Sequence, residues 1–258
     1  MTQSLHPAAQ QGFSSGAELY QQVRPSYPQQ IVTWLQEQLH LSAQSHVIDL
    51  GSGTGKFIPY LQQVTSHIVA VEPIAEMLAQ LQQRYPDIPT LQASSEQLPL
   101  AAESMDAVLC AQSFHWFATI ESLNEIHQIL KPNGQLGLVW NQRDIEVDWV
   151  KALADLLEPL EGDTPRFHHG TWKQVFDQQF LFQLDQVKTY RHWHTGRVED
   201  VVSGRLLSTS FIAALPQAQQ QQLKTQFEQI VASYTGKSAQ DEIAFPYVTY
   251  AYNFKKTI

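Results

Sequence analysis

Between residues 32 and 141 the chain alternates short apolar runs with segments whose apolar residues recur at helical spacing. The apolar runs read HVIDL, HIVAVEP, PTLQAS, DAVLCAQSF and QLGLVWN, and the helix-like segments read KFIPYLQQV, AEMLAQLQQRY and ATIESLNEIHQIL. Alternation of this kind is typical of parallel strands joined by right-handed helical crossovers. The pattern therefore predicts an α/β fold built on a doubly wound, mostly parallel Rossmann-like sheet.

After residue 141 the pattern becomes irregular. The stretch 144–182 and the segments RVEDVVSGRLLSTSFIAAL and AQQQQLKTQFEQIVASYTG read as helices. QVKTYRHWHT alternates like a strand, and the tail EIAFPYVTYAYNFKK is rich in the aromatic and β-branched residues that strands favour. Together with the five earlier runs, these two segments predict a seven-stranded sheet with a helical cap inserted after strand five.

Composition restricts the class of protein. The chain has 258 residues, ample for one large α/β domain, and a formal net charge of −9 from 16 basic and 25 acidic residues. The sequence shows no basic stripe of the kind nucleic-acid binders carry, so we expect no nucleic-acid partner. One cysteine, Cys110, excludes an intramolecular disulfide. Because no apolar run approaches the ~20 residues of a membrane span and the N-terminus lacks a signal-peptide pattern, we expect a cytoplasmic protein without a membrane partner.

The first apolar run leads into the glycine-rich stretch VIDLGSGTGKF. A P-loop would read GxxxxGK[ST], but here the gap before the final Gly-Lys is one residue short, and Phe57 replaces the hydroxyl residue. The dinucleotide pattern GxGxxG would place its third glycine at Lys56, where only glycine permits close helix–strand packing. What remains is D-x-G-x-G-x-G after a strand, which favours a nucleoside ligand that carries no phosphate.

Two acidic residues stand at the ends of the first two apolar runs. Glu72 ends the second run, VAVE, where a carboxylate can accept hydrogen bonds from both hydroxyls of a ribose. Asp49 lies at the end of the first run, where it can hold an ammonium group directly or through water. The two carboxylates therefore predict a ligand that has both a ribose and an amino group.

These residues carry a family resemblance. VIDLGSGTGKF followed by VAVEPIAEML resembles motifs I and II of class I S-adenosylmethionine-dependent methyltransferases, and LQASSEQLPLAAESMDAVLCAQSFHWF resembles the following motifs of the methyltransferase type-11 group. The opening AELYQQVRPSYP and the FHWF segment are similar to a branch that includes trans-aconitate methyltransferase-like proteins. The resemblance is strong over residues 20–141 and loose afterwards.

The resemblance implies S-adenosyl-L-methionine as the cofactor and a set of residues that bind it. The glycines let the backbone approach the methionine portion and the ribose, Glu72 binds the ribose diol, and Ile74 or Met77 packs near the adenine. The full implied set is Tyr20, Arg24, Asp49, Gly51, Ser52, Gly53, Gly55, Glu72, Pro73, Met77, Ser94, Ser95, Glu96 and Gln112.

The chain departs from the family pattern at Ser94. Many relatives have an aspartate there that holds the adenine amino group, so adenine recognition is left to the Ser95 backbone, Glu96 or water. Gln112, just after strand four, would face the methionine moiety. Arg24 is suited to the cofactor carboxylate because its guanidinium is a fork-shaped donor, but it could equally belong to an N-terminal clasp on the core.

Other residues are candidates for the methyl acceptor. His115 and Trp116 follow the carboxyl end of strand four, where ligands bind in open α/β sheets. His115 is predicted as a general base for a hydroxyl or nitrogen nucleophile, with a packing histidine as the alternative. Trp140 and Arg143, at the end of strand five, could line the substrate pocket.

A histidine pair elsewhere is interpreted as structural. His168 and His169 have no third ligand at a recognisable metal spacing, so we expect a loop pair and no metal.

We therefore expect a methyltransferase, monomeric or homodimeric, that methylates an oxygen or nitrogen atom of a small molecule. A carboxylate acceptor would need only cationic clamps such as Arg143 or Arg205. The alternatives are an NAD-linked Rossmann oxidoreductase, which the glycine spacing opposes, and a non-catalytic S-adenosylmethionine-binding protein. The expected organisation is one domain of residues 1–258, with a cover segment at 1–30, a cofactor-binding core at 31–141, a helical cap at 142–236 that strand six interrupts near 186–195, and a final strand at 242–256.

Overall fold

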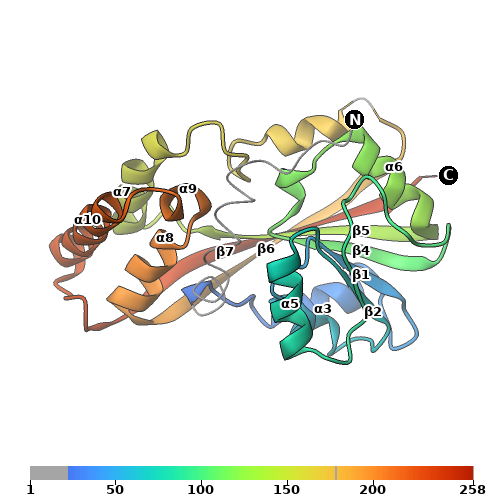
Figure 1. Ribbon diagram of the computed structural model, residues 1–258, viewed down its shortest axis with the longest axis horizontal. Helices are drawn as coiled ribbons and strands as arrows, with labels where there is room; N and C mark the ends of the chain where they lie inside the picture. The colour runs from blue at the N-terminus through green and yellow to red at the C-terminus, as the bar shows by residue number, and fades with distance from the viewer. Residues whose placement is uncertain (1–22, 178, 258) are drawn as a thin grey trace. The chain divides into compact units, whose positions relative to one another are not determined.

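The computed structural model describes residues 23–177 and 179–257. Within them, seven strands form one sheet in the order β3-β2-β1-β4-β5-β7-β6 (Figure 1). The β1–β2, β1–β4, β2–β3 and β4–β5 pairs are all parallel. The predicted seven-stranded, mostly parallel α/β sheet is confirmed. The strands are β1 (Val47–Leu50), β2 (Ile68–Val71), β3 (Thr90–Leu91), β4 (Met105–Ala111), β5 (Leu130–Arg143), β6 (Phe182–Arg197) and β7 (Glu242–Lys256).

Helices occupy most of the predicted crossover segments. The stretch 144–182, predicted as helical, is helical only in part, because Pro159 and two glycines with left-handed backbones, Gly162 (φ 57°) and Gly170 (φ 73°), interrupt it. The helices are α3 (Gln30–Glu37), α4 (Ile58–Leu61), α5 (Ala75–Arg84), η1 (Phe114–Trp116), α6 (Ile120–Ile129), α7 (Asp148–Leu157), η2 (Glu158–Leu160), η3 (Thr171–Phe176), η4 (Glu199–Gly204), α8 (Arg205–Leu207), α9 (Ser210–Ala213) and α10 (Gln217–Thr235).

The chain divides into two compact units. The core unit comprises residues 27–140, 165–190 and 249–257, and the helical unit comprises residues 23–26, 141–164 and 191–248. The strands β5, β6 and β7 are long enough to contribute residues to both units. The boundary at residues 140 and 141 lies beside the end expected for the cofactor-binding core.

In the core unit the sheet is covered on both faces. One apolar cluster joins α3 and α4 with Leu81 of α5 and with strand residues such as Val47 and Leu109. The other joins α6 with Ile48 and Val108, because alternate side chains of a strand point to opposite faces. Figure 1 shows α3 and α5 on one side of β1, β2 and β4, with α6 on the other. This layering leaves the ends of the strands as the place for a ligand.

The helical unit has a hydrophobic core of its own. Its apolar cluster gathers residues of α7, η4, α8, α9 and α10 together with Phe245 and Tyr247 of β7. Val202 and Phe227 in this cluster are fully buried. The irregular sequence after residue 141 therefore builds a packed structure around its own core.

The segment Leu130-Lys131-Pro132-Asn133-Gly134 lies at the start of β5. Leu130 pairs with Met105, but the next pair joins Gln135 to Ala107, so four residues of β5 bulge out between them. Asn133 has a left-handed backbone (φ 65°) within this bulge. The strand therefore begins before this bulge and continues after it.

The strand order places a switch point beside β1. The chain passes from β1 to β2 and β3 on one side, and to β4 and β5 on the other. Open α/β sheets bind ligands in the crevice that such a reversal leaves at the carboxyl ends of the strands. The glycine loop and Gln112 follow the two strands that flank this point.

Candidate functional site

The glycine loop turns sharply at the end of β1. Gly51, Gly53 and Gly55 all have left-handed backbones, with φ of 69°, 55° and 81°. A Cβ atom at Gly51 would lie 2.5 Å from Cβ of Ser113, so a side chain there would clash with the residues after β4. The Gly51 N–H donates to the Val71 carbonyl at 2.8 Å, which anchors the loop on β2.

Glu72 holds this loop from the end of β2. Its Oε2 accepts the Gly53 N–H at 2.9 Å and its Oε1 accepts the Ile74 N–H at 3.0 Å. Burial raises the pKa of the Glu72 carboxyl to about 7, although these two hydrogen bonds act to lower it. Because a carboxylate oxygen has two lone pairs, each oxygen can still accept one more donor, such as a ribose hydroxyl.

Asp49 is a buried carboxyl with an unsatisfied oxygen. The residue is 1 % exposed, and its Oδ2 has no hydrogen-bond partner among the described residues. Burial and the nearby charge of Glu72 raise the pKa of the Asp49 carboxyl to about 8. A buried carboxylate without a partner is costly, and an ammonium group would satisfy it. Asp49 and Glu72, at the carboxyl ends of β1 and β2, therefore fit a ligand that presents an amino group and a ribose.

The residues expected around the adenine lie beside β2 and β3. Met77 of α5 is buried, and its Cε would be 3.3 Å from a Cβ at Gly53, which places it against the glycine loop. Ser95 is buried, and its Oγ is 2.8 Å from Oγ of Ser122 on α6. This hydrogen bond ties the Ser95 side chain to α6.

Other residues expected to bind the cofactor are partly or fully buried. Ser94, Glu96 and Pro73 are half-buried, and Ser52 is buried with its Oγ 3.4 Å from the Val71 carbonyl. Tyr20 lies outside the described residues.

Gln112 directly follows β4, at the carboxyl end of the sheet. Its backbone is left-handed (φ 64°), which is uncommon for a residue with a side chain, and its N–H donates to the Val139 carbonyl at 2.8 Å. The next residue, Ser113, donates its Oγ proton to the Leu50 carbonyl at 2.7 Å. The turns after β1 and β4 are thus tied together, and Gln112 lies beside the glycine loop.

His115 is held by a tryptophan. The Trp140 Nε1–H donates to Nδ1 of His115 at 3.0 Å, which uses the lone pair of the neutral imidazole and places the ring proton on Nε2. Trp116 packs beside it, with ring centroids 5.0 Å apart. Trp140 itself is fully buried among aromatic rings, including Trp172 at 4.6 Å. Of the predicted acceptor residues in the core unit, His115 and Trp116 are partly exposed and Trp140 is not.

Two predicted site residues belong to the helical unit. Arg24 donates from Nε to Oγ of Ser208 at 3.1 Å and from Nη2 to the Ser208 carbonyl at 2.8 Å. Its proposed contact with a cofactor carboxylate stays a prediction. Arg143 ends β5, and its guanidinium interacts electrostatically with Arg205, Tyr247 and Glu161.

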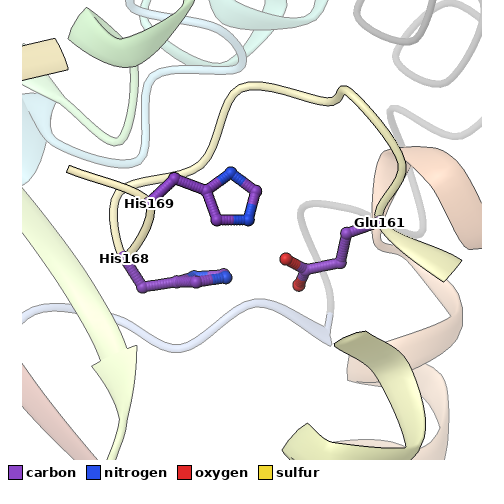
Figure 2. Close-up of side chains that lie close together, drawn as sticks. All are labelled: Glu161, His168 and His169. Carbon is purple, nitrogen blue, oxygen red and sulfur yellow. The ribbon is translucent and has the colours of Figure 1, made fainter. Parts of the chain in front are cut away.

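The histidine pair lies on the loop before η3. Figure 2 shows the rings of His168 and His169 side by side, with centroids 4.5 Å apart. Glu161, also labelled there, belongs to the helical unit. The pair offers two imidazole nitrogens of the kind that bind zinc, and the expectation that no metal binds here stays a prediction.

A doubly wound α/β sheet with a glycine loop and two buried carboxyls at the carboxyl ends of neighbouring strands fits the class of proteins that bind a nucleoside cofactor without phosphate. The comparisons with known proteins agree with this class. A methyltransferase-domain family model matches residues 48–138. An uncharacterised methyltransferase-like protein of Schizosaccharomyces pombe is 33 % identical over 254 residues, covering 95 % of both chains. An uncharacterised methyltransferase of Mycobacterium tuberculosis is 33 % identical over 237 residues, covering 92 % of both.

The chain belongs to the class I S-adenosylmethionine-dependent methyltransferases. Its fold is similar to that of a candidate type II methyltransferase from Anaeromyxobacter dehalogenans, with a TM-score of 0.67, 20 % identity and coverage of 90 % of this chain and 96 % of that one. S-adenosyl-L-methionine is accordingly its methyl donor. The narrower resemblance to trans-aconitate methyltransferase-like proteins stays a prediction. Among the described residues, no helix combines the length and apolarity needed to cross a bilayer.

Two features of the structure were not predicted from the sequence. One is the Trp140–His115 hydrogen bond in the core unit. The other, within the helical unit, is a set of buried polar atoms that have no hydrogen-bond partner among the described residues, on His192, Ser210 and Tyr247. These residues are distant in sequence and have no spacing pattern, so only tertiary structure brings them together.

Proposed function

We propose that this enzyme transfers the methyl group of S-adenosyl-L-methionine to a small-molecule acceptor through an oxygen or nitrogen nucleophile, a carboxylate among them. The observation that carries the proposal is the unsatisfied Oδ2 of buried Asp49, next to Glu72 and a left-handed glycine loop at the switch point of the sheet. The Asp49 carboxyl has no partner for Oδ2 among the described residues, and the ammonium group of the cofactor's methionine portion would supply a cationic one.

Four residues near the carboxyl ends of the strands have a proposed role toward the cofactor. Asp49 takes the ammonium group, Glu72 takes the ribose hydroxyls, and Met77 packs against the adenine. Gln112 faces the methionine portion. When bound, the cofactor supplies a methyl group activated by its sulfonium sulfur, and the residues around it align that methyl group with the acceptor and exclude water.

His115 is the residue of the core unit that we propose acts on the acceptor. Its Nδ1 receives the Trp140 N–H, so the ring presents Nε2–H as a donor. In this arrangement His115 orients the acceptor by a hydrogen bond, whereas removal of a proton would first require the Trp140 bond to break. A carboxylate acceptor already has a free lone pair and needs only this orientation.

Calorimetry of S-adenosylhomocysteine binding tests the proposal. Because the raised pKa keeps Asp49 largely protonated at pH 7, pairing with the ligand ammonium should displace a proton. Titrations in two buffers of different ionisation enthalpy should therefore report proton release, and D49N should bind more weakly and release fewer protons. NAD should not bind. Binding of NAD in place of S-adenosylhomocysteine would identify an oxidoreductase, and cofactor binding without turnover over a panel of acids, phenols and amines would identify a non-catalytic binding protein.

We further propose that the enzyme works in the cytoplasm, as a monomer or homodimer, without nucleic-acid or membrane partners. The net charge of −9 supports the first exclusion.

A further inference from the structure

Two arginines of the helical unit lie close enough to repel each other. Arg143 ends β5, and Arg205 begins α8 with only 8 % of its surface exposed. Burial, and then the charge of Arg205, lower the pKa of the Arg143 guanidinium, while Tyr247 and Glu161 act in the opposite direction. Among the described residues, Glu161 is the one carboxylate that acts on Arg143, so the two cations outnumber it in this part of the unit.

The donors of this pair are poorly satisfied. Arg205 Nη1 donates to Oγ1 of Thr209 at a long 3.4 Å, and its buried Nε has no hydrogen-bond partner among the described residues. An arginine carries five N–H donors, and leaving a buried one unmade costs about 1–3 kcal/mol. The arrangement is unfavourable as it stands, and an anion would relieve it.

Other buried polar atoms of the helical unit are also without partners. The Tyr247 hydroxyl, which acts on Arg143, has none, and neither has Oγ of Ser210, next in sequence to the Thr209 that Arg205 contacts. The ring of His192 lies 5.7 Å from that of Tyr247, and its Nε2 is buried and unpartnered within the described part of the chain. Burial and His194 lower the pKa of His192 to about 4, so the ring is neutral and adds no charge.

We propose that Arg143, Arg205 and Tyr247 form an anion-binding site in the helical unit whose ligand is a small carboxylate. Guanidinium forks match the planar geometry of a carboxylate, and two of them next to a phenol can bind both of its oxygens. The site goes beyond the proposed function because it is built from helical-unit residues alone.

Binding of defined small acids tests the site. Succinate and citrate should bind to the wild-type protein in calorimetry, and succinamide, the neutral analogue of succinate, should not. R143Q and R205Q should each weaken carboxylate binding at least about tenfold, as expected when a charge-assisted hydrogen bond is lost. R197Q is the matched control, because Arg197 lies in the same unit but is half-exposed and paired with Glu199 and Asp200. It should bind carboxylates as the wild type does.

Two further measurements keep the test decisive. The melting temperature of ligand-free R143Q should be no lower than that of the wild type, because removing one cation relieves repulsion. S-adenosylhomocysteine binding is measured in parallel, so that its loss reports on the proposed function and not on this site. The proposal is overturned if no carboxylate binds to the wild type at millimolar concentration, if succinamide binds as well as succinate, if inorganic phosphate binds better than the carboxylates, or if both arginine variants bind carboxylates normally.

Discussion

At the scale of single residues, the paired carboxyls at the ends of β1 and β2 give the protein a measurable dependence on pH. Burial raises the pKa of Asp49 to about 8 and that of Glu72 to about 7 in the folded protein. In the unfolded chain both titrate near their ordinary values, so between about pH 4 and pH 8 the folded state binds more protons than the unfolded state. The free energy of unfolding of the ligand-free protein should therefore fall as pH rises through this window.

D49N should remove much of this dependence. The variant should be more stable than the wild type at pH 8, by an amount on the order of a few kcal/mol, and the difference should be much smaller at pH 5. Denaturant unfolding at both pH values measures the difference. D155N, which changes an exposed aspartate paired with Lys151, is the control and should leave the slope unchanged. A D49N protein with the wild-type slope would show that Asp49 is ionised in the folded state.

Glu72 is expected to contribute to cofactor affinity. E72A should weaken S-adenosylhomocysteine binding by about 1.5–3 kcal/mol, because charge-assisted hydrogen bonds to the ribose are lost along with the support of the Gly53 N–H. The fold should persist, as a circular dichroism spectrum would show. Unchanged affinity in calorimetry would mean that Glu72 is not the ribose ligand.

His115 separates orientation of the acceptor from proton removal. If it orients the acceptor through Nε2–H, H115A should lower kcat about 10–100-fold, H115Q should recover part of this rate, and the pH–rate profile should keep its shape. If it is a base, both variants should lose ~10²–10⁴-fold and the acidic limb of the profile should disappear. Rate measurements over pH decide between the two roles, and a near-normal rate in both variants would make His115 a packing residue.

At the scale of elements, the glycine loop shows how packing and backbone geometry act together. G51A must place a methyl group 2.5 Å from Ser113 Cβ and adopt a left-handed backbone, whereas G162A meets nothing within 4 Å at a similar φ of 57°. G162A should therefore lower the free energy of unfolding only by the cost of a left-handed backbone, about 1–2 kcal/mol. G51A should lower it by more, and the difference between the two variants measures the clash with Ser113. Equal losses would mean that Ser113 moves aside freely.

The sequence predicted the first five strands well and the stretch 144–182 less well. The first five strands were predictable because parallel strands buried on both faces leave apolar runs such as those containing Ile48 and Val108. The carboxylates were predictable because Asp49 and Glu72 end such runs. The helix over 144–182 was overestimated, since its apolar residues satisfy a helical period while Gly162 and Gly170 break the backbone. Arg143 and Arg205 were named from the sequence as candidate clamps for a carboxylate, but the addition of Tyr247 was not predictable, because no spacing pattern connects it to either arginine.

At the scale of the whole molecule, the strands that run through both units provide a route by which cofactor binding in one unit can affect the other. β5 passes from the core unit at Trp140 directly into the helical unit at Asn141, and Asn141 donates to the Ser26 carbonyl at 3.2 Å. If the cofactor orders the carboxyl ends of the strands, local unfolding of the backbone beyond residue 141 should become less frequent. The cap role expected for residues 142–236 stays a prediction.

Hydrogen exchange with and without S-adenosylhomocysteine tests this coupling. Protection should rise at residues 49–56 and 72–77, where the cofactor is proposed to bind, and also within residues 144–215 and at residues 23–27. D49N at the same ligand concentration is the control, because weaker binding should reduce every change together. The helical unit would be independent of the cofactor if protection rose only at the glycine loop and Glu72. In that case succinate should protect the segments around Arg143 and Arg205 whether or not S-adenosylhomocysteine is present, and the acceptor-binding residues should be sought in the core unit next to His115.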